Sequence, residues 1–168
     1  QRIARWSGEP AGSNPADTAS ASTQDTGVLL RDWSLQRQGA DLQATISAGE
    51  FSLDLRFKAV QPVLLQGQDG LSRKGPEAKQ ASYYYSEPQL AVSGALSIQG
   101  QRMAVSAEPA PSNRAWMDHE WSESLMHPEA VGGDWIGMNL ENGGALTVFR
   151  LRRADGSAVW AGGSYREK

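Results

Sequence analysis

The stretch AWMDHEWS holds the densest group of side chains able to do acid–base chemistry. Asp118, His119 and Glu120 are consecutive and lie between two tryptophans. In a β-strand, Trp116, Asp118 and Glu120 would point to one face, and His119 and Trp121 to the other. Two carboxylates on one face can hold each other's ionisation apart, as an acid–base pair requires, and a histidine in an apolar pocket can exchange protons near neutral pH. The candidate catalytic residues from this pattern are therefore His119, Asp118 and Glu120.

A purely structural interpretation of the same stretch stays open. A lone histidine in a β core is more often a hydrogen-bonded structural group than a catalyst, and the two carboxylates can equally bond neighbouring strands or arginines. A metal site is disfavoured, because the only other histidine, His127, is not at a His-x-His or His-x₃-His spacing. No phosphate loop, serine elbow or His-Glu-x-x-His motif occurs, so no metal and no cofactor is predicted.

A second dense region, GQDGLSRKGPEAKQASYYYSEPQL, combines three consecutive tyrosines with basic side chains. On a strand, Tyr83 and Tyr85 share a face and Tyr84 opposes them. One interpretation is an aromatic rim at a pocket mouth, with Lys74 contacting an anion or a hydroxyl group. The alternative is a lid loop whose tyrosine hydroxyls tie strands together. The candidate substrate-binding residues are Tyr83, Tyr84, Tyr85, Trp116, Trp135 and Lys74.

Period-two alternation predicts the elements that must position these side chains. Residues 42–46 and 51–57 alternate apolar and polar, as expected of strands with one buried face. The turn-forming sequences SAGE, ENGG and ADGS, together with a turn near Gln99-Gly100, predict hairpins. We expect roughly seven to nine short strands in an all-β, antiparallel meander that forms a lipocalin-like, calycin-type β-barrel or a strongly curved sheet.

A change in composition divides the chain. Residues 1–26 are rich in small and polar residues, which predicts a flexible or loop-rich segment, and residues 27–168 are expected to form the β domain. The 168-residue chain has a net charge of −3 and no basic stripe, which argues against a nucleic-acid partner. No apolar run approaches the roughly 20 residues that span a bilayer, so no transmembrane segment is predicted. The absence of cysteine excludes thiol chemistry and disulfides.

Five motifs together resemble a known family: LQGQDGLSRKGP, QASYYYSEPQLAVSGAL, AWMDHEWS, DWIGMNLENGGAL and FRLRRADGS. Over about Leu30 to Tyr165 the chain resembles the lipocalin-like family of predicted secreted hydrolases and AttH-type proteins, and more distantly the carotenoid 1,2-hydratases (hydroxyneurosporene synthases). The resemblance implies export as a secreted or periplasmic protein, or as a membrane-anchored lipoprotein in the full-length form. It also implies two calycin-like barrels side by side.

For chemistry, the resemblance implies cofactor-free hydration of an isoprenoid C=C bond through a carbocation. The family's His-x-Trp element matches His119 and Trp121, so the resemblance adds Trp121 to the candidate catalytic residues. It also makes His119 and its acidic neighbours, Asp118 first, candidates for proton delivery. Tryptophan and tyrosine faces would stabilise the cation. Gly133 departs from the tryptophan expected in the family, and the link before Arg114 is longer than usual. The family's early Glu-Trp-Trp-Tyr strand and second barrel are not found in the sequence, so we expect a piece of a two-barrel protein.

Three functions remain open at this point. The first is binding of an apolar or amphipathic small molecule, such as a lipid, isoprenoid or polyketide, in a β-barrel pocket. The second is a cofactor-free acid–base enzyme, either a hydratase or lyase acting on an isoprenoid C=C bond or a secreted hydrolase. The third is a structural scaffold. The expected partners are an apolar small molecule and a second barrel domain.

Overall fold

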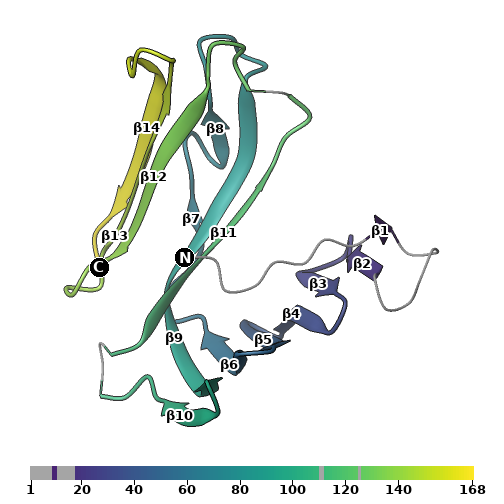
Figure 1. The fold of residues 1–168 in the computed structure, drawn as a ribbon. Coiled ribbons are helices and arrows are strands. Elements are labelled where there is room, and N and C mark those ends of the chain that lie inside the picture. Colours follow the sequence, from purple (N-terminus) through teal and green to yellow (C-terminus); the bar gives the residue numbers. More distant parts are fainter. Residues whose placement is uncertain (1–8, 11–17, 110–111, 125) are drawn as a thin grey trace. The chain divides into compact units, whose positions relative to one another are not determined.

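The computed structural model describes residues 9–10, 18–109, 112–124 and 126–168 (Figure 1). Every regular element within these ranges is a β-strand, from β1 to β14. The chain divides into two compact units, unit 1 with residues 1–59 and 91–113 and unit 2 with residues 60–90 and 114–168. The predicted all-β class is confirmed, and there are more strands than the alternation predicted, because several have only two to four residues.

Unit 1 is one sheet in which consecutive strands are neighbours. Its strands are β1 (Glu9–Pro10), β2 (Thr18–Ala21), β3 (Gly27–Leu30), β4 (Trp33–Gln38), β5 (Asp41–Ala48), β6 (Phe51–Lys58), the later part of β9 (Ala81–Ile98) and β10 (Gln101–Val105). All neighbouring pairs are antiparallel except β1 and β2. Within the described residues the strand order does not return to its beginning, so this unit holds an open sheet.

The predicted alternation of unit 1 is confirmed. Leu42 and Ala44 on β5 are buried and lie opposite Phe57 and Leu55 of β6. Two residues connect β5 to β6, and Gln99 and Gly100 connect β9 to β10 with positive φ angles of 51° and 79°. Positive φ at both central residues is what a tight type I′ turn requires. In the predicted loop-rich segment 1–26, residues 18–21 form β2, which pairs with β3 just beyond the segment. Residues 1–8 and 11–17 lie outside the described residues.

Unit 2 contains the remaining strands in two sheets. They are β7 (Leu64–Leu65), β8 (Leu71–Arg73), the earlier part of β9, β11 (Arg114–Trp121), β12 (Gly132–Asn139), β13 (Ala145–Arg152) and β14 (Ala158–Arg166). The strands β7, β8 and β11 all pair with β9, while β12, β13 and β14 form an antiparallel sheet in chain order. The predicted ENGG and ADGS hairpins connect these last three strands, with Gly143 and Gly156 at positive φ.

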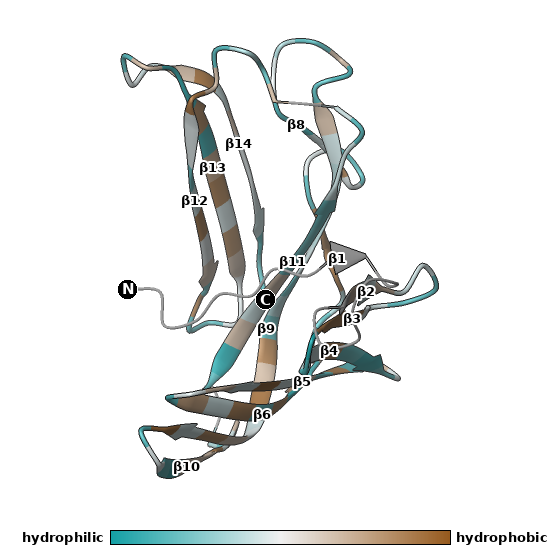
Figure 2. Ribbon diagram, turned by 45° about the vertical axis from the view of Figure 1, so that its right-hand side comes forward, coloured by the Kyte–Doolittle hydropathy of each residue, from teal (hydrophilic) through white to brown (hydrophobic). Residues whose placement is uncertain are grey.

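The core of unit 2 follows the period of two along β13. Ala145, Thr147 and Phe149 are buried, and the residues between them are more exposed. Figure 2 shows the apolar residues of β9 and β13 as brown segments. Along β9, the side chains of Ser82, Tyr84 and Ser86 are all buried, and they share one face. Among the described residues, none belongs to a helix long and apolar enough to cross a membrane.

Candidate functional site

Unit 2 contains a cavity of about 490 Å³ that is partly open to solvent. Residues on β9 and β11 and in the adjoining loops line one side, and residues on β12 and β13 line the other. The lining includes Lys74, Ser82, Tyr84, Glu120, Trp121, Gly133, Asp134, Trp135, Phe149 and Leu151. The volume falls in the range of small-molecule sites, and the wall combines aromatic rings with a few polar groups, as such sites do.

The wall formed by β12 and β13 owes its shape to strand register. Trp135 pairs directly with Phe149, and Gly133 with Leu151. Directly opposed residues of an antiparallel pair project to the same face, so these side chains form one apolar surface. Gly137 leaves room for the indole of Trp135, because a Cβ at this position would lie 2.7 Å from a carbon of that ring.

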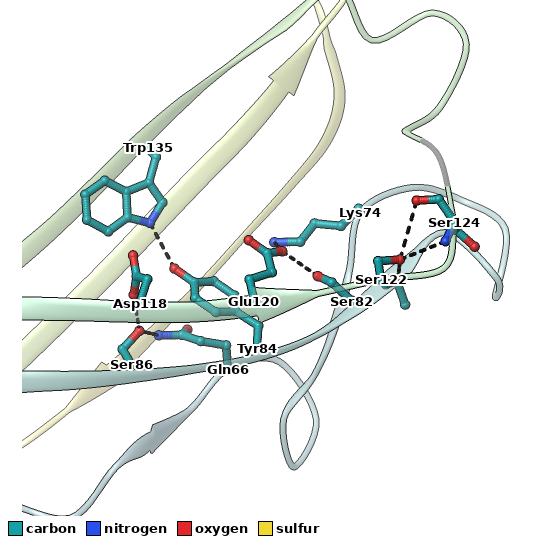
Figure 3. Close-up of polar contacts among 11 residues, drawn as sticks. Gln66, Lys74, Ser82, Tyr84, Ser86, Asp118, Glu120, Ser122, Ser124 and Trp135 are labelled. Atoms are coloured by element: carbon teal, nitrogen blue, oxygen red, sulfur yellow. Dashed lines mark hydrogen bonds and ion pairs between the residues drawn. The ribbon is translucent and has the colours of Figure 1, made fainter. Parts of the chain in front are cut away.

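A cation and a carboxylate form the polar part of the lining. The Nζ atom of Lys74 lies 2.8 Å from Oε1 of Glu120, and the hydroxyl of Ser82 donates to the same oxygen (Figure 3). Lys74 Nζ also lies 4.1 Å from the ring centroid of Phe149 and 4.8 Å from that of Tyr84. These are cation–π distances. We call Lys74, Glu120 and Ser82 the lysine cluster.

A second polar group surrounds the hydroxyl of Tyr84, whose side chain is only 3% exposed. The indole N–H of Trp135 donates to this hydroxyl over 3.1 Å, and the charge of Asp118 acts on the same hydroxyl. Oδ1 of Asp118 accepts hydrogen bonds from Ser86 at 2.6 Å and from the indole of Trp116 at 2.7 Å. Burial, with a further contribution from the charge of Asp118, raises the pKa of Tyr84 to about 12. The phenol of Tyr84 is therefore a weaker acid than that of an ordinary tyrosine.

Sequence reasoning missed a buried amide beneath this group. Nε2 of Gln66 donates to Ser86 at 2.9 Å (Figure 3). The same nitrogen donates to Thr147 at 3.1 Å, so Gln66 connects β9 to β13. All three of these side chains are buried. Ser82 and Ser86 each lie two residues from Tyr84, and this spacing could have indicated a polar group here, since it places their hydroxyls on the same strand face as Tyr84. Gln66 carries no comparable signal, because its partners are distant in the chain.

The opposite face of β9 and β11 carries an aromatic row. Tyr83 stacks on Trp121 with 5.5 Å between ring centroids, and His119 meets Trp121 edge-on at 5.2 Å. The hydroxyl of Tyr85 lies 3.2 Å from Nδ1 of His119. Tyr83 and Trp121 are each more than half exposed. Trp121, at the end of β11, also reaches the cavity lining.

The candidates from the sequence thus separate into two groups. Lys74, Tyr84, Glu120, Trp121 and Trp135 line the cavity. Asp118 and Trp116 adjoin the cavity. Asp118 accepts hydrogen bonds from Ser86 and Trp116, and the ring centroid of Trp116 lies 6.3 Å from that of Trp135 in an edge-on contact. His119, Tyr83 and Tyr85 lie on the other strand face. The predicted separation of Asp118 and His119 onto opposite faces is confirmed, and β11 is regular enough to maintain it. Within the described residues, no three His, Asp or Glu side chains gather as metal ligands.

The raised pKa of Tyr84 predicts a specific loss of stability in alkali. The folded chain holds the phenol proton up to about pH 12, whereas an unfolded tyrosine releases it near pH 10. This contribution is therefore complete below pH 10 and is lost as the pH rises from 10 to 12. The free energy of unfolding of the wild type should fall by on the order of 2 kcal/mol more than that of Tyr84→Phe across this interval.

Urea unfolding at a series of pH values, followed by circular dichroism, measures this difference. The control is Tyr83→Phe, which removes an exposed hydroxyl from the same strand and keeps Tyr84. Equal pH dependence in the wild type and Tyr84→Phe would contradict the assignment of a buried, protonated phenol.

Comparison with known proteins agrees with this architecture. The crystal structure of a putative AttH from Nitrosomonas europaea matches with a TM-score of 0.80 and 43% identity, over 88% of this chain and 44% of that one. The crystal structure of kievitone hydratase from Nectria haematococca matches with a TM-score of 0.70 and 13% identity, over 90% of this chain and 46% of that one. The second likeness shows the fold alone. No curated protein gives a significant match.

The chain spans less than half the length of both solved chains. Its sequence matches the AttH-like family over residues 3–168, a wider range than the five motifs indicated. The family resemblance predicted from those motifs is confirmed, and the chain belongs to the AttH-like family.

Proposed function

We propose that unit 2 binds an amphipathic small molecule in its cavity. The observation that carries the proposal is the division of the lining into an apolar wall and a polar cluster. Trp135, Phe149 and Leu151 offer an apolar surface to a hydrocarbon or ring system, and the lysine cluster offers hydrogen bonds to a polar group. Burying apolar ligand surface against such a wall supplies affinity, while a few convergent polar groups fix orientation.

A second candidate function is cofactor-free hydration of a C=C bond in the bound molecule. The observation that favours it is the presence of a phenol hydroxyl, from Tyr84, and a carboxylate, from Glu120, in the same cavity lining. Hydration requires a proton donor for one carbon and a base that removes a proton from the attacking water. Tyr84 and Glu120 both line the cavity and could take these roles. The chain shares its fold with kievitone hydratase at 13% identity, and this shared fold is what supports hydration as a candidate function.

Fluorescence of N-phenyl-1-naphthylamine, a neutral apolar probe, tests the binding proposal. The probe should brighten in the wild type, and Leu151→Trp should weaken its binding at least about tenfold, since the larger side chain occupies the cavity. Val148→Trp is the matched control, because Val148 lies on the other face of the same strand and is exposed. Equal binding by the wild type and Leu151→Trp, or equal loss in both variants, would refute a site in this cavity.

An incubation experiment with the same protein distinguishes binding from turnover. After incubation with the isoprenoid alcohol farnesol, the extracted ligand is analysed by mass spectrometry. Recovery of unchanged farnesol supports a binding function. A product heavier by one water, formed by the wild type and not by Tyr84→Phe, supports hydration.

A further inference from the structure

Lys74 is a cation whose charge is already balanced inside the cavity. Its side chain is only 18% exposed and contacts the faces of Tyr84 and Phe149. The carboxylate of Glu120 lies 2.8 Å from Nζ, and Ser82 bonds the same carboxylate. An ion pair in partly desolvated, aromatic surroundings is held more firmly than one in open water. The lysine cluster therefore presents a neutral, dipolar polar site to a ligand.

The other carboxylate of the lining is also balanced. Oδ2 of Asp134 accepts a hydrogen bond from Nη2 of Arg150 at 2.8 Å, and Arg152 lies 3.5 Å from its other oxygen. These arginines hold the pKa of Asp134 below its usual range. No cation in the lining is left without a carboxylate partner among the described residues.

This arrangement disfavours an anionic ligand. A carboxylate approaching Lys74 would have to displace Glu120 or lie beside it, and two adjacent carboxylates repel each other. A hydroxyl group meets no such barrier. The ammonium group has three N–H donors, so it can donate to the ligand oxygen while keeping Glu120. Within the described residues both contacts to Glu120 use Oε1, which leaves Oε2 to accept from the ligand hydroxyl.

From this balance we infer that the cavity selects a neutral, hydroxyl-bearing amphipath and that Glu120 is the residue that rejects carboxylates. The inference rests on the proposed binding function and names the ligand class for the same site. It also assigns Glu120 a role in specificity that its position beside His119 did not indicate. Replacing Glu120 with glutamine would keep the shape of the side chain while leaving Lys74 as an unbalanced cation, which is a carboxylate-binding arrangement.

Displacement of N-phenyl-1-naphthylamine by 1-decanol and by decanoate at neutral pH tests the inference. The two competitors share a chain length and differ in the polar group. The wild type should bind decanol at least about tenfold more tightly than decanoate, and Glu120→Gln should shift this ratio at least about tenfold toward decanoate. In the double variant Lys74→Met, Glu120→Gln the gain for decanoate should disappear, because the cation is gone.

The outcomes separate this inference from the binding proposal. A wild type that binds decanoate as tightly as decanol overturns the inference, and this comparison requires no variant to fold. An unchanged ratio in Glu120→Gln, or a shift that persists without Lys74, also overturns it. If the probe binds and neither competitor displaces it, the ligand class is wrong while the cavity remains a binding site. If the probe itself does not bind, the proposed function fails.

Discussion

Gly94→Ala is expected to lower the free energy of unfolding by about 3 kcal/mol. Gly94 lies in the part of β9 that belongs to unit 1, opposite Leu55 of β6, and its φ angle is +132°. Side chains of L-residues rarely tolerate this backbone conformation. A Cβ on Gly94 would also overlap the carbonyl oxygen of Asp54 and lie 3.1 Å from Cα of Leu55. The strain and the overlap act together, because the obstructing atoms are backbone and cannot rotate away.

Urea denaturation followed by tryptophan fluorescence measures this loss. Gly49→Ala is the matched control, since Gly49 lies in the turn between β5 and β6, has no positive φ and would place its Cβ in open space. We expect the control to change the free energy of unfolding by less than about 0.5 kcal/mol. A Gly94→Ala protein as stable as Gly49→Ala would show that β6 and β9 do not approach each other as described.

Gln89→Ala should destabilise unit 2 by a similar amount, about 3 kcal/mol, and should also weaken probe binding in the cavity. The side chain is 4% exposed, and its Nε2 donates to the carbonyls of Leu140 at 2.9 Å and Gly144 at 2.8 Å. Its backbone N–H donates to Asn139 at 2.7 Å. One residue of β9 is thus bonded to the end of β12 and to the turn that precedes β13.

The cost arises because alanine removes two buried hydrogen bonds, to the carbonyls of Leu140 and Gly144, and leaves the volume of the amide side chain unfilled. Binding should weaken because β9 carries Tyr84, whereas β12 and β13 carry the apolar wall. Gln99→Ala is the matched control, since Gln99 has a similar φ of 51° and is exposed in a turn. Chemical denaturation and probe titration of both variants give the comparison. Equal stability of the two would exclude Gln89 as a connection between the sheets.

Local patterns were sufficient for much of the fold. Hydrophobic alternation and turn chemistry act between residues that are close in the chain, so the strands around Leu42, the ENGG and ADGS hairpins and the turn at Gln99-Gly100 were predictable. The same locality explains why Asp118 and His119 could be assigned to opposite faces, because a strand's side-chain period is two whatever surrounds it. The family followed from motifs of the same kind.

Local patterns could not predict the contacts between distant segments. Gln66 and Gln89 have no periodic or motif signal, yet they connect strands that are far apart in the chain. The pairing of Lys74 with Glu120 depends on how β8 and β11 lie against β9. Such contacts depend on long-range packing, for which no local pattern is specific.

For AWMDHEWS, the sequence alone established a strand with carboxylates on one face and a histidine on the other. Which face borders a cavity was decided only when β12 and β13 came to lie over Tyr84 and Glu120. The physical reason is that both faces are locally equivalent, each with a titratable group beside a tryptophan. Only the packing of a second sheet against one of them distinguishes the face that lines the cavity from the exposed row formed by His119 and its aromatic neighbours.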